Sequence, residues 1–256
     1  MRNVWVICRK ELRSYFASPI AYAVMALFAL IFGFVFYMAT RDFYNFAFRS
    51  QMMGGGPQPM NVNEQVIRPV LGFAGTVALF LIPMITMRLI AEEKRSGTIE
   101  LLLTSPIQDF SIILGKWLGA MFLYLCVLGM SALSVILLFA WGKPDWKPVL
   151  VAYLGLILQG GCLLAIGTFI SALTSNQIVA GGVTFFVSLL LWILSWSTAF
   201  DTTTTSKVIN YLSIVTHMEN FSKGILDLKD VVFYVSFIFF ALFMTLRQME
   251  SLRWRT

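Results

Sequence analysis

The densest group of charged side chains in this sequence lies in one strip, residues 91–106, between two long apolar segments. Glu92, Glu93, Lys94 and Arg95 are consecutive there, and Glu100 follows shortly after. Charges this dense cannot lie in lipid hydrocarbon, so the strip must lie at a water interface. The three leucines that follow Glu100 would be exposed to water unless lipid or a partner covers them. The strip therefore predicts a surface for a soluble partner.

Residues that favour helix ends predict a short helix inside this strip. Ser96 or Gly97 can begin the helix, Glu100 is favourably placed in its first turn, and Thr104 ends it. Such a helix is only about 12 Å long and too short to be stable alone. We therefore expect it to dock on something, and an ordinary interfacial loop is the alternative.

A second helix start follows directly. Ser105 can be the N-cap, Pro106 can occupy the first helical position, and Gln108 can complete a capping box. The next helix is therefore expected to begin at Pro106.

Motifs of self-contained catalysis are absent from the sequence. It holds no G-x-x-x-x-G-K-[ST] phosphate loop, no H-E-x-x-H and no G-x-S-x-G. His217, beside Glu219, is the only histidine, and we expect it to make a structural hydrogen bond rather than bind metal or haem. The three cysteines show no metal-binding spacing. The sequence predicts no catalytic residue, no metal site and no cofactor.

The composition is that of an integral membrane protein. The 256 residues are 58% hydrophobic and only 12% charged, whereas soluble proteins average about 25% charged residues. Six apolar segments approach or exceed the length of about 20 residues that crosses a bilayer. They are residues 20–40, 70–87, 117–141, 149–173, 178–200 and 231–246. The expected fold is all-α, a single transmembrane domain over residues 1–256 with six spans.

These six segments, as drawn, contain no Asp, Glu, Lys, Arg or His. Proton-coupled carriers and voltage sensors need such residues at depth, and so would an enzyme embedded in the membrane. We therefore expect any energy for transport to come from outside the chain.

The Lys and Arg residues predict the orientation. They crowd beside span ends in residues 2–13, 88–116 and 247–255, all on one side of the six spans. By the positive-inside rule both termini and the charged strip are expected to be cytoplasmic. The net charge of +6 is then explained by topology and anionic lipid, and no nucleic-acid partner is expected.

Three further segments flank the spans. Residues 1–18 predict an amphipathic interfacial helix, and a basic flank with no further role is the alternative. Residues 41–68 predict an outer loop with a flexible Gly- and Pro-rich tip. Residues 201–230 predict an outer helical hairpin before the last span, with a surface loop as the alternative, and Asp227 or Asp230 can cap that span.

Several motifs resemble a known family. The run EEKRSGTIELLLTSP at residues 92–106, with LGK at 114–116, resembles the signature of type-two ABC transporter permeases, the exporter-like class. Residues 9–20, 171–177, 219–224 and 227–230 are similar to the gliding-motility-associated branch of that class. The resemblance covers nearly the whole chain.

The resemblance implies a role for the region 91–113 and for the outer hairpin. It implies that the helix from Gly97 to Pro106 is a coupling helix seated in an ATPase cleft, and that the outer hairpin closes the exit. The expected coupling residues are Glu92, Glu93, Arg95, Gly97, Thr98, Glu100, Leu101, Leu102, Thr104 and Pro106. The expected outer-gate residues are Met218, Glu219, Phe221 and Gly224.

The resemblance also implies partners. They are a dimer of cytosolic ABC ATPases that binds the ATP, a second permease or permease-like subunit, membrane lipid, and an auxiliary subunit with an extracytoplasmic domain. The expected function is a permease subunit of an ATP-driven exporter, or a transmitter of motion, in a bacterial inner membrane. The alternative is an assembly protein that anchors a cytoplasmic partner without a transport path.

Overall fold

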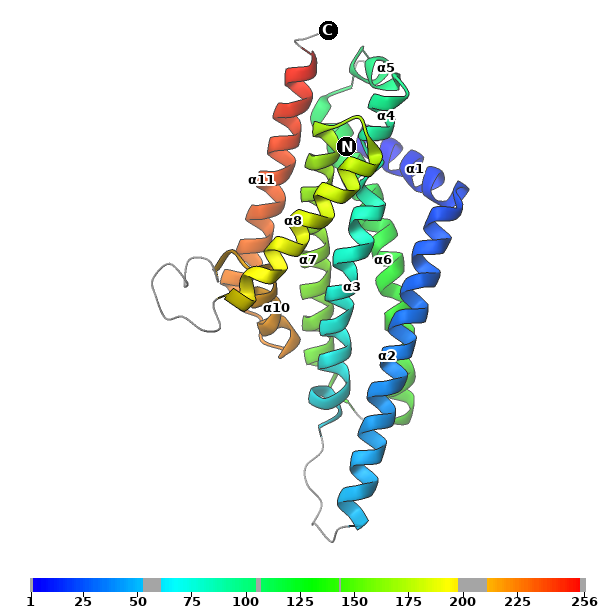
Figure 1. Cartoon of the computed structure of the whole chain (residues 1–256), viewed down its shortest axis with the longest axis vertical. Helices are drawn as coiled ribbons and strands as arrows, with labels where there is room; N and C mark the ends of the chain where they lie inside the picture. The colour runs from blue at the N-terminus through cyan, green and yellow to red at the C-terminus, as the bar shows by residue number, and fades with distance from the viewer. Residues whose placement is uncertain (1, 53–60, 105–106, 143, 198–210, 254–256) are drawn as a thin grey trace.

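The computed structural model describes residues 2–52, 61–104, 107–142, 144–197 and 211–253, and over these ranges the chain is all-helical (Figure 1). Six helices are long and apolar enough to cross a membrane. They are α2 (Pro19–Met52), α3 (Arg68–Thr86), α6 (Asp109–Trp141), α7 (Trp146–Leu173), α8 (Gln177–Ser197) and α11 (Leu228–Arg253). Each of the six expected spans falls on one of these helices, although residues 198–200 of the fifth lie outside the described ranges.

Five shorter elements complete the described chain. They are α1 (Arg2–Ala17), the π-helix η1 (Asn63–Ile67), α4 (Ala91–Arg95), α5 (Thr98–Thr104) and α10 (Ile214–Ser222). Figure 1 shows α1, α4, α5 and the last turns of α11 toward one end of the bundle, which we call the α5 end. The beginning of α3 and α10 lie in the other half, which we call the α10 end.

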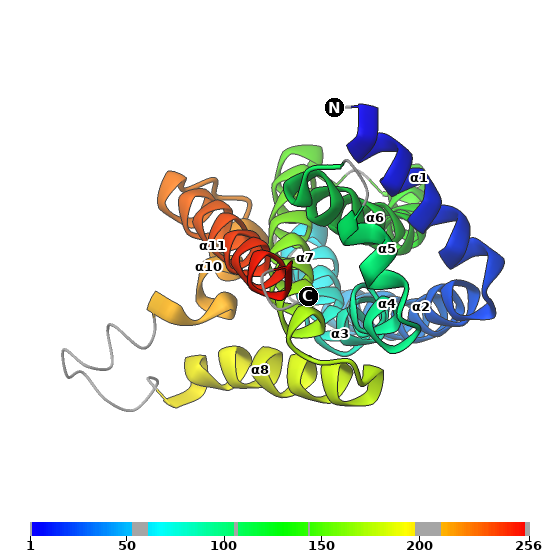
Figure 2. The ribbon, with the colours of Figure 1, turned by 90° about the horizontal axis from the view of Figure 1, so that it is seen from above.

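Helix α7 is the centre of the bundle. It contacts α3, α6, α8, α10 and α11, and Figure 2 shows it between α3, α6 and α11. Two glycines let neighbours approach its backbone closely: a Cβ at Gly160 would overlap the Tyr124 ring of α6, and a Cβ at Gly155 would lie 2.5 Å from the Cβ of Phe221 in α10. Small residues at helix contacts in this way are typical of membrane bundles.

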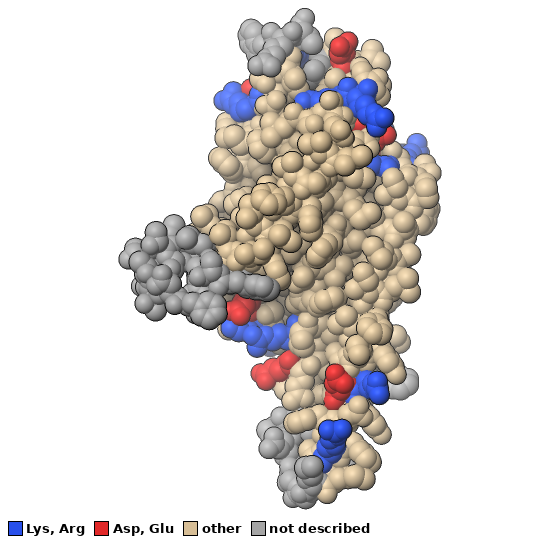
Figure 3. Space-filling view, viewed as in Figure 1, with Lys and Arg blue, Asp and Glu red and all other residues tan. Residues whose placement is uncertain are grey.

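Charged side chains are absent from the middle of the visible surface. Figure 3 shows Lys, Arg, Asp and Glu toward both ends of the molecule, with an uncharged band between them. Such a band is what a bilayer core requires, because unpaired charge in hydrocarbon is costly.

The expected outer loop at residues 41–68 needs a correction. Helix α2 continues without a break to Met52, and Asn63–Ile67 form the π-helix η1. The reason is local: no Gly or Pro interrupts residues 41–52, and the Tyr44 and Phe48 rings stack one turn apart with centroids 6.4 Å apart. The Gly- and Pro-rich residues 53–60 lie outside the described ranges.

The expected helix start at Pro106 is also wrong. Gln108 has an extended backbone, with φ −67° and ψ 133°, so it is the N-cap and α6 begins at Asp109. The carbonyl of Gln108 accepts the first hydrogen bond, from the Ser111 N–H at 2.8 Å. The Asp109 carboxylate in the first turn complements the positive end of the helix dipole. Ser105 and Pro106 themselves lie outside the described residues.

Candidate functional site

Helix α5 presents an uncovered leucine at the α5 end of the bundle. Leu101 is 74% exposed, and Glu100 and Thr104 are exposed beside it. The helix begins after Gly97, whose φ of +72° is in the left-handed region that favours glycine. The turn is also held by a contact of 2.9 Å between the hydroxyls of Ser96 and Thr98. The sequence-predicted short helix is therefore present, and Leu101 lies uncovered on its surface.

Helix α4, which precedes α5, is tied to the central helix α7. The Ser171 hydroxyl of α7 accepts the backbone N–H groups of Ile90 and Ala91 at 3.1 and 3.0 Å. The Lys94 ammonium donates to the carbonyl of Ala172, also on α7. These bonds satisfy donors that the start of a helix would otherwise leave open. Helix α4 is therefore held directly against the central helix of the bundle.

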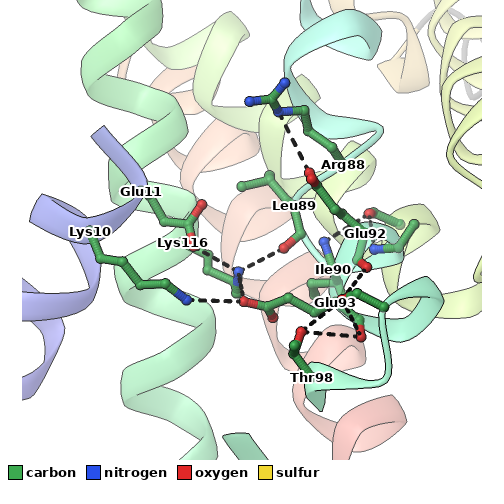
Figure 4. A network of polar contacts seen from close by, with 12 residues as sticks. Lys10, Glu11, Arg88, Leu89, Ile90, Glu92, Glu93, Thr98 and Lys116 are labelled. Atoms are coloured by element: carbon green, nitrogen blue, oxygen red, sulfur yellow. Dashed lines mark hydrogen bonds and ion pairs between the residues drawn. The ribbon is translucent and has the colours of Figure 1, made fainter. Parts of the chain in front are cut away.

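A buried ion network joins α4 to α1 and α6 (Figure 4). The ammonium of Lys116 in α6 lies 2.8 Å from Oε1 of Glu11 in α1 and 2.9 Å from Oε1 of Glu93 in α4, and it donates to the carbonyl of Leu89 at 2.8 Å. The Lys116 side chain is only 3% exposed. Lys10 adds a partly exposed contact with Glu93 at 3.4 Å. Three separate helices thus share one buried positive charge.

Helix α1 lies across the bundle against the beginning of α6. A Cβ at Gly115 would lie 2.8 Å from the Cβ of Ile7, and a Cβ at Gly119 would lie 2.8 Å from the Cβ of Glu11. The GxxxG pair therefore brings α1 close enough for Glu11 to reach Lys116. A helix is present over Arg2–Ala17, and part of its apolar side packs on protein. Its position in a membrane leaflet stays a prediction.

Tyr15 and Arg88 make a second link between α1 and the segment before α4. The Tyr15 hydroxyl donates to the carbonyl of Ile85 at 3.0 Å, and burial raises the pKa of this phenol well above its usual value, so it remains a donor. The Arg88 guanidinium lies 5.4 Å from the Tyr15 ring centroid and 3.9 Å from the Glu92 carboxylate. A basic flank without further role does not describe this helix, because it holds two buried polar contacts.

A groove of about 450 Å³ lies between α1, α4 and α5. Its walls include Glu11, Glu93, Leu101 and Leu102. The Glu93 Oε2 atom is buried and has no hydrogen-bond partner among the described residues. Apolar and acidic side chains next to an exposed short helix can receive apolar and basic side chains of a docked protein.

The structure brings most of the predicted coupling residues together. Glu92, Glu93, Arg95, Gly97, Thr98, Glu100, Leu101, Leu102 and Thr104 all lie on α4, α5 or the turn between them. Pro106 lies outside the described residues. Glu93 differs from the others, because its Oε1 atom is also bonded to Lys116 within the bundle. Sequence reasoning did not assign Glu11, Ser171 and Lys116 to the site. A charge near a span end looks like an ordinary interfacial residue, and a serine within a span looks like an ordinary packing residue.

The four predicted outer-gate residues lie at the α10 end. Met218 and Phe221 are buried against Gly155 of α7, whereas Glu219 is exposed. Gly224, with φ +77°, makes the turn that follows α10 and packs against Pro148. Their role as a gate stays a prediction, and residues 201–210 of the expected hairpin lie outside the described ranges.

His217 makes the expected structural hydrogen bonds, but not with Glu219. Its Nδ1 lies 2.6 Å from Oδ1 of Asp230, and its Nε2 lies 2.8 Å from the carbonyl oxygen of Tyr211. Asn220 donates to the other Asp230 oxygen at 2.8 Å. Asp227, not Asp230, caps α11, because its Oδ1 accepts the Lys229 N–H at 3.1 Å. The cluster fixes α10 to α11 and leaves the buried carboxylate paired.

The buried groups Lys116 and Asp230 correct one expectation about the spans. The segments drawn from sequence exclude both residues, but α6 and α11 extend to include them. Each of these two residues lies close to an end of its helix and is paired. They are therefore not part of a series of titratable groups that runs through the bundle. Among the described residues, no group of three or more His, Cys, Asp or Glu is placed to hold a metal ion.

Comparison with known proteins agrees with this architecture. Residues 5–251 match the family described as "ABC-2 family transporter protein". The "Probable multidrug ABC transporter permease YbhR" of Escherichia coli, in strains K12 and O157:H7, is 28% identical over 142 residues. That alignment covers 51% of this chain and 38% of each E. coli protein. Because the family match extends over nearly the whole sequence, the chain belongs to the ABC-2 family of transporter proteins.

Proposed function

We propose that this chain is the membrane-spanning permease subunit of an ATP-driven ABC transporter, working as an exporter or as a transmitter of ATP-driven motion. The observation that carries the proposal is α5, which leaves Leu101 74% exposed while α4 behind it is bonded to α6 and α7. An uncovered apolar patch fits a partner, and rigid attachment to the core fits transmission of force.

We further propose that the partner is a dimer of cytosolic ABC ATPases, which binds and hydrolyses the ATP. This chain has no phosphate-binding loop of its own. The α5 end would then be cytoplasmic, with both termini on that side of a bacterial inner membrane. The clustering of α1, α5 and the end of α11 at one end supports this orientation.

The remaining parts of the proposal rest on the family resemblance. A second permease or permease-like subunit completes the transporter, and an auxiliary subunit with an extracytoplasmic domain accompanies the gliding-motility-associated branch, in which we place this chain. The cargo is amphiphilic, which accords with the multidrug description of the E. coli relative. Met218, Glu219, Phe221 and Gly224 close the exit at the α10 end.

The test is Leu101→Asp in the complex with its ATPase. The change puts an uncompensated charge into an apolar contact, which costs about 3–5 kcal/mol when buried, or roughly 10²- to 10⁴-fold in affinity. Co-purification should be lost while the chain still inserts and elutes as the wild type does. Ser251→Asp adds the same charge on an exposed position near the end of α11 and should leave the complex intact.

Two results would contradict the proposal. Retained association and retained ATPase stimulation in Leu101→Asp would remove α5 from the interface. An ATPase that binds the wild-type chain but whose hydrolysis rate is unchanged by it would favour a simple membrane anchor. The chain alone should show no ATP turnover, and transport in the complex should continue in the presence of a protonophore.

A further inference from the structure

A polar cavity of about 310 Å³ lies at the α10 end, opposite the proposed docking surface. It is formed where η1, the beginning of α7 and the end of α10 meet. Its volume is at the lower end of the range of about 300–1,000 Å³ seen for ligand sites. Because all three elements adjoin the ends of membrane-length helices, the cavity lies at the level of a membrane–water interface.

The cavity carries both signs of charge. Glu64 and Asp145 provide two carboxylates, and Arg68 and Lys223 provide two cations. The side chains of Glu64, Arg68 and Asp145 make no hydrogen bond or ion pair with the described residues, and Lys223 has only an exposed contact of 3.7 Å with Glu219. A balanced set of this kind is complementary to a zwitterion, whereas a purely anionic or cationic ligand would leave one pair of charges opposed.

Asn63 connects two walls of the cavity. The residue is only 8% exposed and lines the cavity. Its Nδ2 donates to the carbonyl of Asp145 at 2.9 Å, but its Oδ1 is buried without a partner among the described residues. This bond joins η1 to the residue before α7 and so fixes two walls of the cavity relative to each other. Asn63 also begins a π-helix, an irregularity that occurs frequently at functional sites.

Exposed apolar side chains adjoin this polar cavity. Trp146 directly follows Asp145 and is 60% exposed, and Leu150 is exposed one turn later. Ile225 and Leu226, which follow the Lys223–Gly224 turn, are also exposed. A tryptophan at the start of a span is typical of the headgroup level of a bilayer. A ligand with a zwitterionic head and apolar chains would match both surfaces.

We propose that this cavity binds the headgroup of a phospholipid whose ammonium carries an N–H, such as phosphatidylethanolamine. The ammonium lies by the carboxylates of Glu64 and Asp145 and donates to them. The phosphate lies by Arg68 and Lys223, and the acyl chains extend along the exposed apolar side chains. Phosphatidylcholine has the same charges but no N–H, so it cannot donate a hydrogen bond to either carboxylate. This site does not depend on the ATPase partnership proposed above.

The test measures which lipid stays with the purified full-length chain. The chain is exchanged into equimolar mixtures of phosphatidylcholine with phosphatidylethanolamine or its monomethyl or dimethyl derivatives, all with the same acyl chains. Retained lipid is then quantified by native mass spectrometry. We expect enrichment of every lipid that keeps an N–H over phosphatidylcholine by about 2- to 10-fold, the factor that one net hydrogen bond gives. Soluble glycerophosphoethanolamine, added as a competitor, distinguishes binding of a free headgroup from binding of the lipid.

Variants of the cavity locate the effect. Glu64→Gln and Arg68→Gln should each lower lipid retention without the loss of a buried bond, and Glu64→Gln should also reduce the preference for N–H-bearing lipids, because it removes a charged acceptor. Lys229→Gln is the matched control, because Lys229 lies near the same end but pairs with Asp227 outside the cavity. Equal retention of phosphatidylethanolamine and phosphatidylcholine by the wild type would overturn the proposal, and so would an equal effect of Lys229→Gln.

Discussion

Replacing Lys116 with methionine should destabilise the α5 end more than any surface change. The lysine ammonium lies within 3 Å of Glu11 and of Glu93, so the two carboxylates are no more than about 6 Å apart. Without the lysine they repel each other by about 3 kcal/mol at an effective dielectric constant of about 20. Both carboxylates are largely buried, so solvent screens them little. Loss of one member of a buried ion network typically costs about 3–5 kcal/mol, which is the destabilisation we expect.

The assay measures the unfolding of the purified chain in detergent. Unfolding is monitored in a denaturant titration and by intrinsic fluorescence on heating. Lys116→Met should lower the unfolding free energy by the amount above. Glu11→Gln should cost less, since Lys116 keeps Glu93 and the carbonyl of Leu89 as partners. The triple variant Lys116→Met, Glu11→Gln, Glu93→Gln should recover much of the loss, because no carboxylate is then left unpaired.

The unfolding free energies of these variants together distinguish the effect of the buried charges from that of packing around Lys116. A single variant Lys116→Met that is as stable as the wild type would refute the buried network. A triple variant no more stable than Lys116→Met would show that packing around the lysine stem, rather than charge, accounts for the loss. Lys10→Gln serves as the control, because Lys10 is mostly exposed and its contact with Glu93 should contribute at most about 1 kcal/mol.

Three further predictions follow from the same structure. The first concerns topology: in a cysteine-free background, single cysteines are placed at Ser96 and at Asn61. An impermeant maleimide should label them from opposite sides of the membrane, with Ser96 on the cytoplasmic side. Labelling of both positions from one side would contradict the topology. The second concerns α1: Gly115→Leu should displace α1 from α6, because even a Cβ at residue 115 would lie 2.8 Å from the Cβ of Ile7. The Cys8 thiol, which is buried in the wild type, should then react with a membrane-permeant thiol reagent that does not modify it in the wild type. Asp230→Leu should cost about 3–5 kcal/mol and speed hydrogen exchange in α10, because it removes the acceptor that holds the buried histidine; unchanged exchange there would show that α10 is held by apolar packing alone.

The sequence by itself determined the number and type of the main elements. Six apolar segments of bilayer length can only be helices in lipid, where every backbone donor and acceptor must be paired within its own segment. The start of the short helix was also predicted to within one residue, at Ser96 or Gly97, because both residue types favour helix starts. The same local reasoning failed at Pro106 and at residues 41–52. A helix boundary depends on which backbone groups find partners, and capping residues only bias that choice.

The tertiary structure alone decided which charges work together. Glu11, Glu93 and Lys116 are far apart in sequence and each looks like an interfacial residue, but close packing of α1 on Gly115 and Gly119 brings them into one buried network. The same holds for Asn63 and the cavity at the α10 end, whose walls come from three separate segments. Hydropathy and the spacing of apolar residues indicate how a single helix is exposed to lipid or water. The pairing of buried polar groups depends on how helices meet each other, and no single segment contains that information.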